Sequence, residues 1–79
     1  MREKKLFTVF AFSTTTAALQ AERLLGEAGL PGRLIPLPPQ ISAGCGLAWA
    51  MPPERGEEAS VVLQEAGAEH SAHSVLLRA

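Results

Sequence analysis

The sequence predicts one small α/β domain, an α+β sandwich with the element order β-α-β-β-α-β. Three observations lead to this prediction. The chain has 79 residues, enough for one hydrophobic core and too few for two, so residues 1–79 are expected to form a single domain. Its hydrophobic content of 47% is that of a globular protein. Finally, the segment 24–29 (LLGEAG) recurs as 62–67 (VLQEAG), and short apolar runs flank both copies.

The first copy of the repeat predicts a strand, a helix and a second strand. Residues 5–12 are rich in aromatic and apolar side chains, which favours a central strand. Ser13 or Thr14 can cap a helix that follows, and Gly29 stands where a left-handed backbone ends many helices. Residues 30–36 are then expected to form the second strand. The inward stripe of the helix would consist of Ala18, Ala21, Leu25 and Ala28.

The second copy predicts the same three elements again. Residues 47–51 form a short apolar strand, and Pro52 and Pro53 suit the first turn of a helix. Gly67 repeats the helix stop of the first unit. The last strand is expected over residues 74–78, with a start as early as position 70. The inward stripe of this helix would consist of Ala59, Val62, Leu63 and Ala66.

Two β-α-β units joined by a hairpin form the ferredoxin-like arrangement, a four-stranded antiparallel sheet with two helices on one face. The usual form of this fold has the strand order 4-1-3-2. Trp49 and Met51 alternate with alanines, so both are expected on one sheet face, with Trp49 in the core or at a subunit contact.

The loop between the second and third strands carries the chemically distinctive residue, Cys45. Prolines stiffen the first part of this loop, and Gly44 and Gly46 flank the cysteine. A cysteine that only packs a core usually lies in a periodic apolar run, and this one does not. The alternative is an inert thiol that acts as a small hydrophobic side chain.

The predicted topology places a helix N-terminus near this thiol. The third strand begins beside the end of the first, so Cys45 is expected to face Ser13, Thr14 and Thr15. Free N–H groups and the helix dipole favour an anion at such a terminus, and a thiolate there has a lowered pKa. We therefore expect a reactive cysteine.

The composition of the chain excludes several classes of function. Net charge is −1, with no basic stripe between aromatic residues, so no nucleic-acid partner is expected. One cysteine excludes an internal disulfide and a zinc site of paired ligands, so no metal is expected, and a free thiol favours the cytoplasm. The basic residues before the apolar run 6–12 suggest a signal peptide, but the run is too short. No stretch approaches the length of a membrane span, so no membrane partner is expected.

Several segments together resemble a known family. They are 12–15 (FSTT), 18–25 (ALQAERLL), 27–29, 33–36, 41–48 (ISAGCGLA), 53–54 and 65–67. In this order and spacing the chain resembles a family of small bacterial proteins described as proposed selenium/sulfur carriers.

The resemblance implies that Cys45 holds the chalcogen as a covalent persulfide or selenide adduct, with no other cofactor. Donor and acceptor proteins would be its partners, and Ser42 and Gly46 would shape the loop. Family members tend to have a basic-acidic pair where this chain has Pro39-Gln40. Arg33, on the preceding strand, could replace the basic residue.

The leading interpretation is thus a carrier without turnover chemistry, and not an enzyme. One alternative is a ferredoxin-like binding module, in which Cys45 is incidental and a sheet face or free edge recognises a partner or a second copy, as in a homodimer. Another is a small thiol enzyme or redox sensor, disfavoured because the chain has no second cysteine and no evident base. His70 and His73 would point to opposite faces of a strand, so they are not expected to act together.

Overall fold

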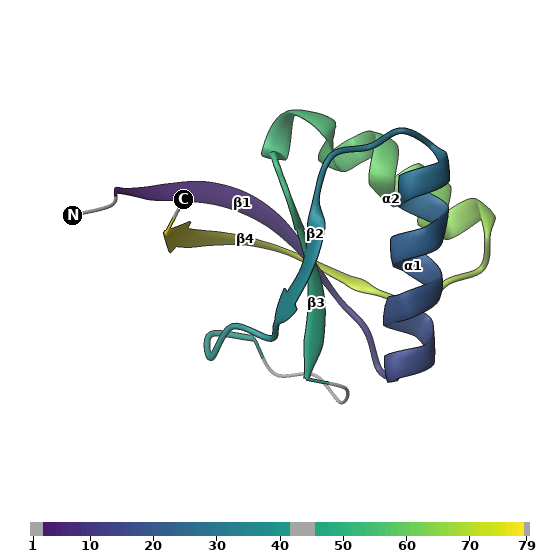
Figure 1. Ribbon diagram of the computed structural model, residues 1–79, viewed down its shortest axis with the longest axis horizontal. Coiled ribbons are helices and arrows are strands. Elements are labelled where there is room, and N and C mark those ends of the chain that lie inside the picture. The colour runs from purple at the N-terminus through teal and green to yellow at the C-terminus, as the bar shows by residue number, and fades with distance from the viewer. Residues whose placement is uncertain (1–2, 42–45, 79) are drawn as a thin grey trace.

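The computed structural model describes residues 3–41 and 46–78 and shows a four-stranded antiparallel sheet with two helices packed on one face (Figure 1). The strand order β2-β3-β1-β4 confirms the predicted ferredoxin-like arrangement. A 3-10 turn, η1, precedes the second helix. The elements are β1 (Lys4–Ala11), α1 (Thr15–Glu27), β2 (Arg33–Pro36), β3 (Leu47–Met51), η1 (Pro53–Arg55), α2 (Gly56–Glu65) and β4 (Ser71–Arg78).

β1 is central and has two different neighbours along its length. It pairs with β4 from Lys4 to Ala11, but with β3 only from Thr8 onward. The first half of β1 and the end of β4 therefore extend beyond the rest of the sheet as a two-stranded ribbon, which ends near both termini in Figure 1. We call residues 4–7 and 75–78 the β1–β4 ribbon.

Both predicted helix stops are confirmed. Gly29 and Gly67 have φ angles of 75° and 71°, in the left-handed region that glycine adopts without steric cost. The N–H groups of Leu30 and Ala68 then reach back to carbonyl oxygens inside their helices, at 3.0 and 2.9 Å. At the other end of α1, Thr14 is the N-cap, because its Oγ1 accepts a hydrogen bond of 3.1 Å from the N–H of Ala17.

Some predicted boundaries and core positions are wrong. β2 begins at Arg33 and not at Leu30, because Leu30 folds into the core beneath the helices. The α-helical part of the second helix begins at Gly56, since the two prolines start a 3-10 turn instead. Ala28 and Ala66 were expected in the core but are exposed, because each is the C-cap residue where its helix ends.

Two apolar clusters lie on opposite faces of the sheet. The cluster under the helices contains Trp49 and Met51 side by side on one face, as predicted, and Trp49 is 3% exposed. No helix of the described residues covers the opposite face. Its apolar cluster consists of Val9, Ala11, Ile41, Ala48, Ala50 and Val75.

The part of the chain that the structure describes contains no helix long and apolar enough to cross a membrane.

Candidate functional site

The loop that carries Cys45 is held firmly at both of its described ends. On one side, Ile41 is 6% exposed in the cluster on the open sheet face, and its N–H donates to the carbonyl of Pro38 at 3.0 Å. On the other, the carbonyl of Gly46 accepts a hydrogen bond of 2.9 Å from the N–H of Leu37. Gly46 has a φ of 76°, a backbone angle that is unfavourable for residues with a side chain. Ser42, Gly44 and Cys45 lie outside the described residues.

The sheet register brings the described end of this loop near the start of α1. Ala11, the last residue of β1, is the partner of Ala48 in β3, and Gly46 directly precedes β3. The chain leaves β1 through Ser13 and enters α1 at Thr15, and these residues are exposed. Gly46 and the N-terminus of α1 therefore lie at the same end of the sheet (Figure 1). The expected approach of Cys45 to Ser13, Thr14 and Thr15 lies outside the described residues.

This helix terminus is free of neutralising charge. The first turn of α1 contains no acidic residue. Within residues 3–41 and 46–78, no acceptor lies within reach of the N–H groups of Thr15 and Thr16. The helix dipole adds a partial positive charge at the same point. With respect to the described residues, an anion brought here would therefore find donors without an acceptor.

Arg33 lies at the other end of the β2–β3 hairpin. It pairs with Ala50, whereas the loop is closed by the pair Pro36 and Leu47. Three residues along a strand span roughly 10 Å, so the backbone of Arg33 is well removed from the loop. Its side chain is exposed, and its proposed support of the loop stays a prediction.

The two histidines have partners of their own. His70 Nδ1 lies 2.8 Å from the carbonyl oxygen of Ala68, a hydrogen bond in which the imidazole is the donor. The same ring packs edge-on against Phe10, with ring centroids 5.4 Å apart. His73 Nε2 lies 2.9 Å from the hydroxyl of Ser71. These contacts account for both side chains without a catalytic role.

Arg55 and Glu58 form the ion pair at the start of α2, with Nε and Oε1 2.6 Å apart. The hydrogen bond from the guanidinium lowers the pKa of Glu58 below its ordinary value, and the carboxylate raises the pKa of Arg55. Both side chains are well exposed, so this pair belongs to the helix surface. No group of three or more His, Cys, Asp or Glu side chains suited to a metal occurs among the described residues.

Sequence reasoning missed one feature, a groove on the open sheet face. Phe7, Ile35 and Leu77 line it together with the basic residues Arg33 and Arg78. The run 5–12 did contain a signal for it. Six of its eight residues are apolar, including 9–12 in succession, so a strand built from it presents apolar side chains to both faces of the sheet.

The fold and this loop define a class: a small α+β protein with one thiol in a glycine-flanked loop, between the second and third strands. Comparison with known families is more specific. The chain belongs to the family described as "Putative Se/S carrier protein-like", whose model matches residues 7–73. No curated protein matches the chain, and no solved structure does.

Proposed function

We propose that this protein carries sulfur or selenium on the thiol of Cys45, without turnover chemistry of its own. Its partners would be a donor protein and an acceptor protein in the cytoplasm, where a lone thiol stays reduced. The observation that supports the proposal is the family match, which spans the loop with Cys45.

The proposed chemistry is an exchange without a net oxidant. The Cys45 thiolate attacks the outer sulfur of a donor persulfide, R–S–SH. A new S–S bond forms to Cys45, the S–S bond of the donor breaks, and the donor leaves as the thiolate R–S⁻. Attack by an acceptor nucleophile on the outer sulfur reverses the exchange and releases the Cys45 thiolate. Selenium would follow the same course from a donor R–S–SeH.

The N-terminus of α1 supports this chemistry. The N–H groups of its first turn would stabilise a thiolate over a thiol, and the thiolate is the nucleophile. The same groups would favour the anionic form of a persulfide. The role given to Ser13, Thr14 and Thr15 is therefore electrostatic. Ser42, Gly44 and Gly46 would allow the loop backbone to come close to the sulfur of Cys45.

The first experiment measures loading. The protein is incubated with a low-molecular-weight persulfide, and its intact mass is recorded after removal of the reagent. We expect a gain of one sulfur atom in the wild-type protein and none in Cys45→Ser. Treatment with a thiol reductant should remove the added sulfur. A wild-type protein that folds but gains no sulfur would contradict the proposal.

The second experiment measures activation of the thiol. The rate of alkylation of Cys45 is followed against pH, and we expect an apparent pKa below the ordinary value of about 8.5. Thr15→Glu adds a negative charge in the first turn of α1 and should raise this pKa, whereas Thr15→Gln is the neutral control. An apparent pKa at the ordinary value in all three proteins would remove the role of the helix.

A further inference from the structure

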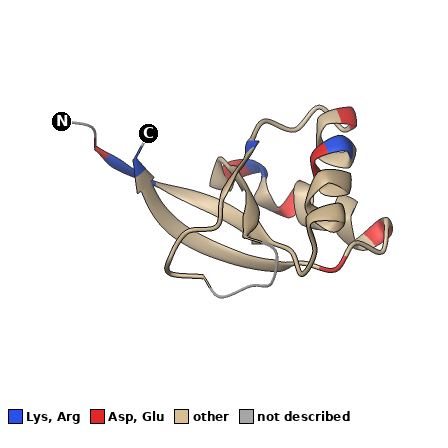
Figure 2. Cartoon of the chain, turned by 60° about the horizontal axis from the view of Figure 1, so that its bottom comes forward, with Lys and Arg blue, Asp and Glu red and all other residues tan. Residues whose placement is uncertain are grey.

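Charge is segregated between the two layers of the protein. Every glutamate except Glu3 lies on α1, η1, α2 or the turn after α2. The strands carry Lys4, Lys5, Arg33 and Arg78 and no acidic residue. Figure 2 shows mostly acidic positions along the helices, with Arg23 on α1 and Arg55 on η1 as the basic ones, and basic positions near the termini and at the start of β2. The helix layer is therefore acidic, and the exposed end of the sheet is basic.

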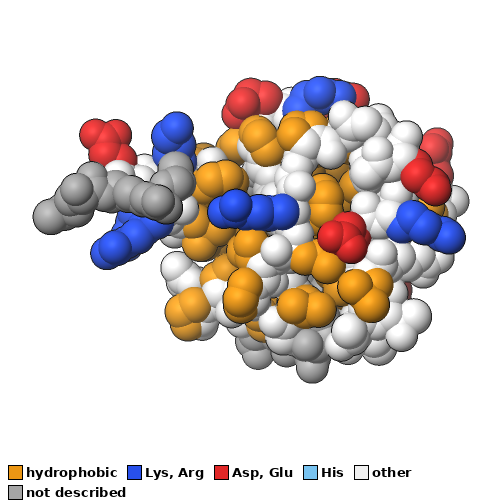
Figure 3. Space-filling view, viewed as in Figure 1, with side chains coloured by type: hydrophobic (Ala, Val, Ile, Leu, Met, Phe, Trp, Pro, Cys, Tyr) orange, Lys and Arg blue, Asp and Glu red, His pale blue; other side chains and the backbone are white. Residues whose placement is uncertain are grey.

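Lys4, Arg33 and Arg78 line an apolar groove on the open sheet face. Its floor is formed by Phe7, Ile35 and Leu77, from β1, β2 and β4. Arg33 and Arg78 line it where it opens, and the segment 36–40 forms a further wall. In Figure 3, apolar side chains gather around basic ones on this side of the molecule. The groove is thus lined by apolar and cationic side chains together.

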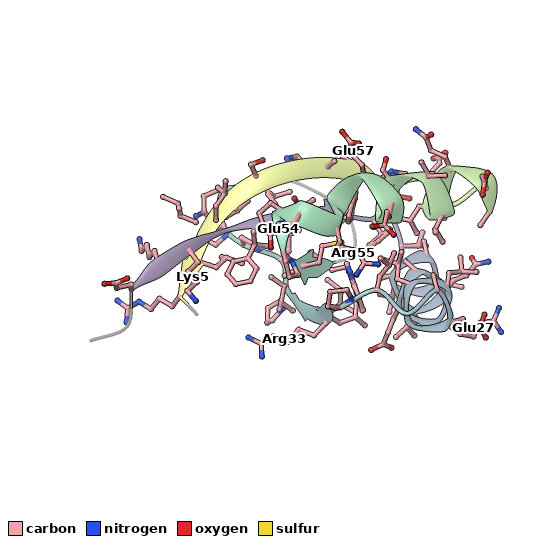
Figure 4. The ribbon with its side chains drawn as sticks, turned by 90° about the horizontal axis from the view of Figure 1, so that it is seen from above. Lys5, Glu27, Arg33, Glu54, Arg55 and Glu57 are labelled. Carbon is pink, nitrogen blue, oxygen red and sulfur yellow. The ribbon has the colours of Figure 1, made fainter. Side chains whose placement is uncertain are left out.

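Within residues 3–41 and 46–78, these cations form no ion pair. Among the described residues, the ion pair of Arg55 and Glu58 is the one formed, and it lies at the start of α2. Arg33 and Lys5 lie on the sheet, whereas Glu27, Glu54 and Glu57 lie on α1, η1 and α2 (Figure 4). No ion pair joins these two groups in the part of the chain that the structure describes. No carboxylate of the described residues is therefore paired with the positive groups beside the groove.

We propose that this groove binds an acidic amphipathic helix of a partner protein, with its apolar stripe on the floor and its carboxylates at Arg33 and Arg78. The dimensions suit a helix. The floor residues come from β1, β2 and β4, and Ala50 of β3 also lines the groove. Four strands side by side measure roughly 14 Å across, and a helix with its side chains is about 10 Å wide. The match of charge would orient the partner and speed its association. This inference does not depend on whether Cys45 carries a chalcogen.

A partner in trans fits better than a second copy of this chain. The helix layer of a second copy is acidic and has Val61 exposed among glutamates, so it resembles the proposed ligand. However, the helices of one copy would then bind the groove of the next copy, which is a head-to-tail contact. Each added copy would leave another groove free, so the assembly would grow without closing.

The test uses a synthetic amphipathic peptide as the probe, cross-linked to hold it helical. It has leucine at the i, i+3, i+4 and i+7 positions and glutamate elsewhere, and a second peptide replaces every glutamate with lysine. Binding is followed by fluorescence anisotropy with the Cys45→Ser protein, which keeps the measurement independent of thiol chemistry. We expect the glutamate peptide to bind and its affinity to fall with added salt, because exposed charges are screened.

Two charge reversals locate the binding site. Arg33→Glu should weaken binding at least about tenfold, as expected for loss and reversal of a charge in the interface. Arg23→Glu makes the same change on α1 and should alter affinity by less than about twofold. Both arginines are exposed, so both variants should fold, and circular dichroism checks this. Leu77→Asn tests the apolar floor and should weaken binding of the glutamate peptide.

Three results would overturn the proposal: equal affinity for the glutamate and lysine peptides, equal effects of the two arginine variants, or no binding at low salt. Light scattering could also contradict the proposal. If the protein self-associates and Arg33→Glu abolishes the association, the ligand is a second copy of this chain.

Discussion

Trp49 packs against the backbone of Gly32 so closely that a Cβ atom added to Gly32 would fall 2.6 Å from Cε2 of the indole. The two residues join the end of the α1–β2 connection to the centre of the core. Gly32 also has a φ of 150°, which side chains rarely adopt. Space and backbone conformation thus both require glycine at this position.

Gly32→Ala should therefore lower the free energy of unfolding by about 2 to 4 kcal/mol, from overpacking and backbone strain together. Gly26→Ala is the matched control. Gly26 lies within α1 with nothing within 4 Å of an added Cβ, so its replacement should stabilise by about 0.5 to 1 kcal/mol. Urea denaturation of both variants checks the difference. Similar values for the two would contradict the close packing at Trp49.

Leu25 and Leu19 lie on the same helix in opposite environments. Leu25 is 0% exposed beneath the helix, whereas Leu19 is 51% exposed. Leu25→Ala should cost about 2 to 5 kcal/mol, because it removes buried methyl groups and leaves a cavity. Leu19→Ala should change stability by less than about 0.5 kcal/mol. Thermal unfolding of both variants tests which face of α1 packs on the sheet.

Thr14 supplies the side-chain cap of α1. Thr14→Ala removes the acceptor for the N–H of Ala17 and should cost about 1 kcal/mol. Thr14→Ser keeps the hydroxyl and should restore most of the lost stability. If both variants unfold at the same urea concentration, the hydrogen bond at the cap does not stabilise the helix.

Glu58 should show the pH dependence of a paired carboxylate. Its pKa is lowered by the hydrogen bond from Arg55, so the folded state holds its proton less tightly than the unfolded chain does. The contribution of the pair is present above the ordinary pKa of a glutamate and is lost as pH falls through the lowered value. In Arg55→Gln, the pKa of Glu58 should move up toward its ordinary value, and NMR titration of its carboxyl carbon measures this. A Glu58 pKa that does not move would show that another group lowers it.

The repeat made the order of elements predictable, because each copy contained its own strand pattern, helix and glycine stop. The strand order then came from the usual form of the fold, and the structure confirms it. Element ends were less predictable. The apolar side chain of Leu30 suits a strand as well as the end of a helical unit, and tertiary packing decides between them.

The groove could not be predicted from the sequence. Arg33 and Arg78 are far apart along the chain, and each alone is an ordinary exposed cation. They line one groove because β4 lies beside β1, and because the twisted ribbon brings its end near β2. The loop cysteine, in contrast, could be recognised from the sequence alone. Local sequence, a thiol between two glycines, was enough to single it out.

The pairing of β1 with β4 also has a consequence for folding. The central strand of the sheet pairs along its whole length with the last strand, so this edge stays open until most of the chain has been ordered. Such distant pairing slows folding, typically to milliseconds or longer. During that interval Phe7, Val9 and Phe10 lie along an unpaired edge that can associate with other chains. Refolding yield should therefore fall as protein concentration rises, although the finished sheet covers most of this strand.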